Sequence, residues 1–229
     1  MSIAIRRIDR LAAGVGLIGF STLALIEDRL DPTSGVSFYE AATAHPGLLT
    51  ASALTLLGSA VLTVPAIAGI VFQAPDRGAV LARVGGFFAL LGALGHTALA
   101  VIYLMMRSLA GGDHAQMVAF EDRFNADTTI GIVGMVLLLS FGVGIALLAW
   151  AAWRAGLIGW WAPAVVTAVV LAHGVLPDDL PPVVPFTALT AIAVVFGLLG
   201  VRLLTTPTYQ PSAGPTDQAV VGSGGRSGW

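Results

Sequence analysis

Long apolar runs, almost free of charge, constrain this chain more than any other feature of its sequence. The six runs cover about Leu11–Ile26, Leu48–Phe72, Val84–Met106, Thr128–Trp153, Leu157–Val175 and Phe186–Leu204. A helix needs about 20 apolar residues to cross the hydrocarbon core of a bilayer. Because the runs are continuous and do not alternate with polar residues, they predict helices and not the strands of a barrel. We therefore expect an all-α integral membrane protein, built as a bundle of six transmembrane helices.

Composition supports a membrane protein and excludes several kinds of site. Only 10% of the 229 residues are charged, whereas a soluble domain carries about 25%. The sequence has no cysteine, which excludes disulfides, thiolate nucleophiles and thiolate zinc sites. It has no lysine either, so a Schiff-base enzyme or a lysine-bound retinal is excluded.

The distribution of charges between the loops predicts an orientation. If the loops alternate sides, eight arginines and three aspartates fall on one side, and three arginines and ten acidic residues fall on the other. Arginine-rich loops face the cytoplasm, so we expect both termini to be cytoplasmic in a multi-pass protein of the cell membrane. Residues 1–204 would form the transmembrane domain, with the lipid bilayer as its partner. Residues 205–229 are rich in Pro, Gly, Ser and Thr and would form a disordered cytoplasmic tail.

Two outer loops are long for a compact bundle: "EDRLDPTSGVSFYEAATAHPG" and "RSLAGGDHAQMVAFEDRFNAD". In the second loop, Asp113 and Gln116 resemble a capping box at the start of a helix. Met117, Phe120 and Phe124 then recur at helical spacing. This pattern predicts a short amphipathic helix, which would either lie in the membrane interface or cover the mouth of the bundle as a lid.

Titratable residues gather towards the predicted outer face, and five of them are candidates for acid–base catalysis. These candidates are Glu27, Glu40, His96, Asp127 and His173. An ionisable group within a membrane helix is a functional hypothesis by default. Structural roles remain open beside it: Glu27 can end a helix, Asp127 can cap one, and His96 can bond to a neighbouring helix. Asp178 and Asp179, in "LPDDLPP", are typical turn residues.

We expect no haem and no metal ion. His96 would lie about 16 Å below the end of its helix and His173 about 7 Å, a mismatch of roughly 9 Å that speaks against paired axial ligands. His45 matches His173 better in depth, and a haem or a metal held there with outer carboxylates is the alternative. No ligand pair at helical i, i+3 or i, i+4 spacing supports that alternative.

The sequence carries no nucleotide-binding, metalloprotease, serine-hydrolase or Asp-rich diphosphate motif. It has no basic patch for nucleic acid. The leading interpretation is a membrane-embedded enzyme with an outward-opening site lined by acidic residues and histidines, which does protonation-initiated chemistry on a lipophilic isoprenoid or lipid substrate. The alternative is a non-enzymatic small transporter, immunity factor or accessory subunit. The sequence leaves the oligomeric state open.

Overall fold

The computed structural model describes residues 3–33, 36–74, 78–175 and 183–205, and within these ranges it contains helices and no strands. The helices are α1 (Ile3–Leu30), α2 (Phe38–Ala44), α3 (Pro46–Gln73), α4 (Ala79–Leu109), α5 (His114–Ala126), α6 (Thr128–Arg154), α7 (Trp161–Val175) and α8 (Val183–Thr205). The predicted turn at Asp178 and Asp179 lies outside the described residues, as does the predicted tail from residue 206 onward.

Within the described ranges, five helices are long and apolar enough to cross a membrane: Asp9–Leu30, Pro46–Gln73, Ala79–Leu109, Thr128–Arg154 and Phe186–Thr205. These segments correspond to five of the six predicted runs, so the chain has the architecture of a helical membrane protein. The remaining run corresponds to α7, whose described apolar stretch, Trp161–Ala172, is shorter. A sixth span therefore stays a prediction.

The helix α7 begins four residues later than the apolar pattern predicts, and a glycine accounts for the delay. Gly156 adopts a left-handed conformation with φ of 74°, which L side chains rarely tolerate. The amide of Gly156 donates to the carbonyl of Trp153 (2.8 Å), and the amide of Leu157 donates to the carbonyl of Ala152 (2.8 Å). This pair of bonds is a Schellman motif, which ends α6 and turns the chain before α7.

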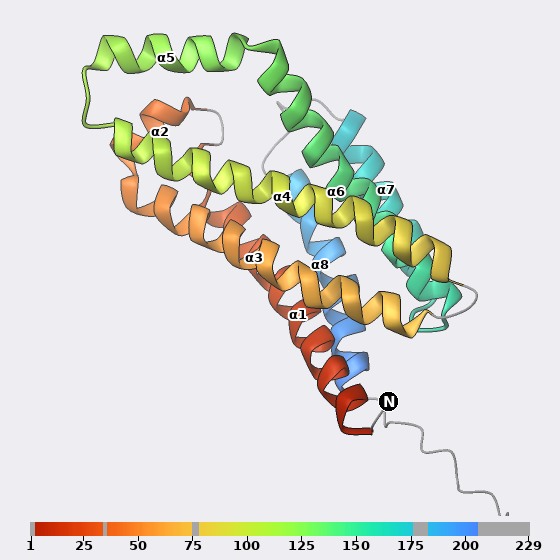
Figure 1. Cartoon of the computed structure of the whole chain (residues 1–229). Coiled ribbons are helices and arrows are strands. Elements are labelled where there is room, and N and C mark those ends of the chain that lie inside the picture. Colours follow the sequence, from red (N-terminus) through yellow and green to blue (C-terminus); the bar gives the residue numbers. More distant parts are fainter. Residues whose placement is uncertain (1–2, 34–35, 75–77, 176–182, 206–229) are drawn as a thin grey trace, which may run out of the picture.

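The six long helices form a closed ring of neighbours. In order, α3 packs against α1, α1 against α8, α8 against α7, α7 against α6, α6 against α4, and α4 again against α3. The short helices α2 and α5 lie at one end of this ring, and α5 extends across between the ends of α4 and α6 (Figure 1). We call this end of the bundle the α2–α5 end.

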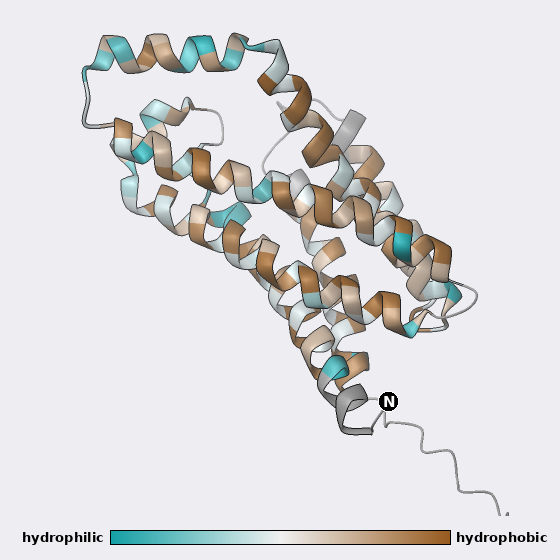
Figure 2. Cartoon of the chain, viewed as in Figure 1, coloured by the Kyte–Doolittle hydropathy of each residue, from teal (hydrophilic) through white to brown (hydrophobic). Residues whose placement is uncertain are grey.

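The two ends of the bundle differ in charge. Arg10 at the start of α1 donates to the carbonyl of Leu203 at the end of α8 (3.0 Å), so these arginine-bearing ends lie together, away from the α2–α5 end. Arg154, the last residue of α6, lies near the start of α4, because Ala151 one turn before it packs against Gly78. It is therefore also at this end of the bundle. The acidic residues of α2 and α5 lie at the opposite end. Figure 2 shows hydrophilic residues gathered on α5 and apolar residues along the long helices.

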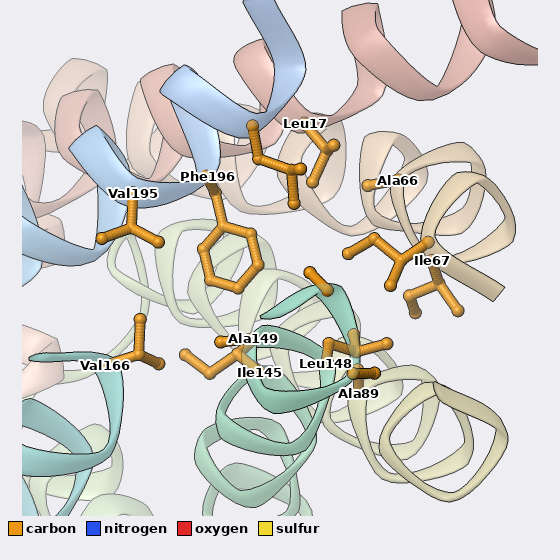
Figure 3. Close-up of a cluster of buried hydrophobic side chains, with 14 of the residues drawn as sticks. Leu17, Ala66, Ile67, Ala89, Ile145, Leu148, Ala149, Val166, Val195 and Phe196 are labelled. Carbon is orange, nitrogen blue, oxygen red and sulfur yellow. The ribbon is translucent and has the colours of Figure 1, made fainter. Parts of the chain in front are cut away.

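Apolar side chains from every long helix meet in the middle of the ring. Figure 3 shows Leu17, Ile67, Ile145, Val166 and Phe196 pointing into one cluster. Glycines bring the backbones together around it: a Cβ on Gly144 would collide with the backbone of Ala89. Small residues therefore let α4 and α6 approach each other closely. A second apolar cluster, which includes Tyr103 and Leu49, lies towards the α2–α5 end.

Candidate functional site

Polar side chains from α1 and α3 meet at the α2–α5 end of the bundle. The hydroxyl of Ser52 donates to Oε1 of Glu27 over 2.9 Å. Ser52 is fully buried, with 0% exposure, and Glu27 is partly buried. The charged residues that act electrostatically on Glu27 are Asp28 and Asp31, both acidic. The carboxylate of Glu27 therefore relies on a hydroxyl donor for stabilisation.

The segment that follows α1 adds a second carboxylate and a hydroxyl, and α4 adds the hydroxyl of Tyr103. Oδ1 of Asp31 accepts hydrogen bonds from the amide (2.9 Å) and the hydroxyl (2.7 Å) of Thr33, a turn typical of an Asp that ends a helix. The hydroxyl of Thr33 lies 3.4 Å from the hydroxyl of Tyr103 on α4. Tyr103 is only 3% exposed, and both Glu27 and Asp31 act on it electrostatically. We call Glu27, Asp31, Thr33, Ser52 and Tyr103 the polar cluster.

The helices α2 and α5 cover this cluster, and Glu121 ties them together. Its carboxylate accepts from the amide of Phe38 (Oε1, 2.7 Å) and from the amide of Tyr39 (Oε2, 3.0 Å). Both amides lie in the first turn of α2, where backbone donors lack partners within the helix. The ring of Phe38 lies 5.7 Å from that of Tyr103, centroid to centroid. The cover, as we call α2 and α5, therefore contacts the polar cluster directly.

The helix predicted within the second long loop is confirmed as α5, with Asp113 accepting from the amide of Gln116 (3.0 Å). The residue of α5 that is buried is not one of the apolar residues that the sequence pattern indicates. Met117, Phe120 and Phe124 are partly buried, whereas the acidic Glu121 is 5% exposed. The two amides of α2 explain this, because a buried carboxylate needs hydrogen-bond donors.

Three of the five predicted catalytic residues form hydrogen bonds within their own helix or at its start. Glu40 shares a capping box with Ser37 at the start of α2. Asp127 caps α6, its Oδ1 accepting from the amides of Thr129 (2.8 Å) and Ile130 (3.1 Å). Nδ1 of His96 lies 3.0 Å from the carbonyl of Gly92, one turn earlier in α4.

Among the candidates whose side chains are described, only Glu27 lies in a cluster of polar groups from several elements. The ring of His96 instead meets Phe141 of α6 edge to face, with centroids 4.6 Å apart. The fifth candidate, His173, lies in the last turn of α7, and its side chain is outside the described part of the chain. Among the described side chains, no hydrogen bond or ring contact joins Glu27, Glu40, His96 and Asp127 to one another.

Within the described ranges, no three His, Asp or Glu side chains lie close enough together to hold a metal ion. His45, the residue of the alternative haem or metal site, is exposed at the junction of α2 and α3. Its predicted partner His173 has no described side chain. The carboxylates of Glu27 and Asp31 each accept a hydrogen bond from a hydroxyl group.

Sequence patterns predict neither the other four members of the polar cluster nor the role of Glu121. A signal exists for Tyr103, the single tyrosine within the apolar run from Val84 to Met106. A signal also exists for α2, because "SFYE" fits a capping box. Ser52 carries no such signal, because hydroxyl residues are ordinary in membrane helices.

Comparison with known proteins identifies no relative. No protein family matches the chain, and neither a curated protein nor a solved structure matches it.

Proposed function

We propose that the protein is a membrane-embedded enzyme that transfers a proton to or from a lipophilic substrate at the polar cluster. In this proposal the bundle has six spans, both termini are cytoplasmic and the α2–α5 end faces outward from the cell membrane. One observation supports it above all: at one end of an apolar bundle, Glu27 bonds to Ser52, and Thr33 bonds to Asp31 and lies within hydrogen-bond distance of Tyr103. The two groups lie close enough for both carboxylates to act electrostatically on Tyr103. Polar groups are expensive to keep within a membrane protein and usually serve a function.

The chemistry of the cluster fits proton transfer. A carboxyl group and a phenol can each hold a proton and release it to a bound molecule. Glu27 is the proposed acid or base, and Ser52 fixes its orientation through their hydrogen bond of 2.9 Å. Tyr103 is the proposed second proton carrier. Glu40, His96, Asp127 and His173 are not needed for this step, although His173 would lie at the same end of the bundle.

Comparative lipid analysis tests this function and does not require the substrate to be identified first. Membranes would be prepared from cells that express the wild-type chain, Glu27→Gln, Tyr103→Phe or Asp122→Asn at equal protein levels. Asp122 is an exposed acidic residue of α5 outside the polar cluster and serves as the matched control. We expect a lipid-soluble product that requires Glu27 and Tyr103 but not Asp122. An unchanged lipid profile in Glu27→Gln would contradict the proposed enzymatic function.

A second candidate function is a non-enzymatic role as a small transporter, immunity factor or accessory subunit. The burial of the cluster favours it: Ser52 and Tyr103 are 0% and 3% exposed beneath the cover. A substrate could reach Tyr103 only after α2 and α5 move, whereas a buried hydrogen-bond network needs no access to hold helices together. The second candidate predicts that no lipid species depends on Glu27, so the same experiment distinguishes the two.

A further inference from the structure

An apolar cleft of about 310 Å³ opens between α4 and α6 on the side towards the α2–α5 end. Residues of the ranges 95–102 and 129–138 line it. At its deep end the helices touch, because a Cβ on Gly95 would lie 2.8 Å from Cβ of Leu137. Beyond that contact they separate: no atom outside the local backbone lies within 4 Å of the Cβ position of Gly134.

The helix α5 explains why the cleft exists. It runs His114–Ala126, which corresponds to about 20 Å at 1.5 Å per residue. This rigid segment extends across between the ends of α4 and α6 (Figure 1). The ends of the two helices are therefore held apart, while the tight contact at Gly144 and Ala89 holds their middles together. The cleft is the space left between these two constraints.

The surroundings of the cleft decide what can fill it. Its lining is apolar apart from the hydroxyl-bearing Thr129, and it lies on two helices able to span a membrane. Ala98 and Val133 in the lining are exposed, so the cleft opens sideways to the hydrocarbon of the bilayer and not towards water. An open cleft of this kind, in contact with fluid lipid, is filled by hydrocarbon, because leaving the space empty would forfeit van der Waals contacts.

The length and direction of the cleft fit one acyl chain of one leaflet. The lining extends over about 10 Å along α4 and about 14 Å along α6, at 1.5 Å per residue. One leaflet supplies about 15 Å of hydrocarbon, half the thickness of the bilayer core. The polar end of the cleft, at Thr129, lies next to the cap that Asp127 forms on α6. A lipid with its headgroup at this level would direct its chain inward, towards Gly95.

We propose that the cleft between α4 and α6 binds one acyl chain of a membrane phospholipid from the leaflet at the α2–α5 end. The site is separate from the polar cluster and does not depend on the proposed function. Leu99 and Ile102 form the wall between them, since both line the cleft and both pack against the apolar cluster that contains Tyr103. The bound chain would thus support the helix face that positions Tyr103.

Two open glycines of α6 provide a matched test. Gly134→Leu places a side chain in the cleft, whereas Gly131→Leu adds the same side chain outside it; neither new Cβ meets an atom within 4 Å. Each variant, purified in mild detergent, would be titrated with dioleoyl phosphatidylglycerol. Native mass spectrometry would measure how many lipids stay bound and with what affinity. We expect one tightly held lipid in the wild type and in Gly131→Leu. We expect affinity to fall about tenfold or more in Gly134→Leu, a difference of at least about 1.4 kcal/mol.

Further measurements keep the proposal falsifiable if a glycine variant does not fold. Ala98→Phe blocks the opposite wall, and Leu94→Phe is its exposed control outside the cleft. In the unaltered protein, a phospholipid with a photoreactive group in its acyl chain should crosslink to peptides from 95–102 and 129–138. Equal lipid binding by Gly134→Leu, crosslinks confined to other helices, or preferential binding of a prenyl alcohol over the phospholipid would each overturn the proposal.

Discussion

The hydroxyl of Ser52 donates a hydrogen bond of 2.9 Å to the carboxylate of Glu27, and this contact joins α3 to α1 at the α2–α5 end of the bundle. A buried acceptor that loses its donor costs free energy. We expect Ser52→Ala to lower the free energy of unfolding by about 1 kcal/mol, the upper part of the range for hydrogen bonds between membrane helices. Thermal unfolding in detergent measures this. Ser108→Ala, at an exposed serine of α4, should unfold like the wild type.

A double-mutant cycle tests whether the loss of stability in Ser52→Ala comes from its hydrogen bond with Glu27. If the bond accounts for the loss, Ser52→Ala should cost little in a background that already carries Glu27→Ala, because the acceptor is gone. Equal losses in both backgrounds would show that Ser52 stabilises the bundle by another route.

Glu121 is expected to control how firmly the cover is closed. Its carboxylate accepts the amides of Phe38 and Tyr39, and hydrogen bonds to charged groups contribute about 1.5–3 kcal/mol. Glu121→Ala should therefore speed hydrogen exchange at the amides of α2 by about tenfold or more, since 1.4 kcal/mol corresponds to a factor of about ten. Exchange mass spectrometry measures this directly.

The neighbouring acidic residue provides the control for the cover. Asp122 is exposed on α5, so Asp122→Ala should leave exchange in α2 unchanged. Equal acceleration by Asp122→Ala would indicate that the negative charge of α5 is responsible. Unchanged exchange in Glu121→Ala would show that apolar contacts of Phe38 and Phe120 suffice to hold α2 and α5 in place.

The long helices could be predicted because each is a long apolar run, and α5 because Asp113 and Gln116 fit a helix start. Six apolar runs correspond to α1, α3, α4, α6, α7 and α8, and Asp113 marks the start of α5. The predicted start of α7 is too early, because the apolar residues Leu157 and Ile158 directly follow the left-handed Gly156 and belong to the turn before the helix.

The polar cluster could not be predicted beyond Glu27, since it depends on which helices are neighbours. Ser52 and Tyr103 are 51 residues apart in the chain, and nothing in either run indicates that Ser52 meets Glu27 or that Tyr103 meets Thr33. Similarly, the burial of Glu121 follows from its distance to two backbone amides of α2 and not from its position on α5. Contacts between separate elements set the role of these residues.

We expect His96 to stabilise the bundle through the contact between its ring and Phe141. The ring contacts Phe141 edge to face at 4.6 Å, and aromatic pairs of this kind contribute about 0.5–1.5 kcal/mol beyond burial. His96→Phe keeps a ring against Phe141 and should preserve the melting temperature in detergent, whereas His96→Ala should lower it. If His96→Phe folds as well as the wild type but abolishes the product that depends on Glu27, the imidazole itself takes part in the chemistry.

Asp127 is expected to stabilise the start of α6 by capping it. Its Oδ1 accepts the amides of Thr129 and Ile130, and loss of such a cap costs about 1 kcal/mol. Asp127→Ala should therefore destabilise the protein by about this amount and speed exchange in the first turn of α6, while Asp127→Asn, which keeps a capping oxygen, should restore most of both. Thermal unfolding and hydrogen exchange measure the two effects. The catalytic interpretation of Asp127 also expects Asp127→Asn to be stable, but with the lipid product lost, whereas the capping role alone leaves the product unchanged.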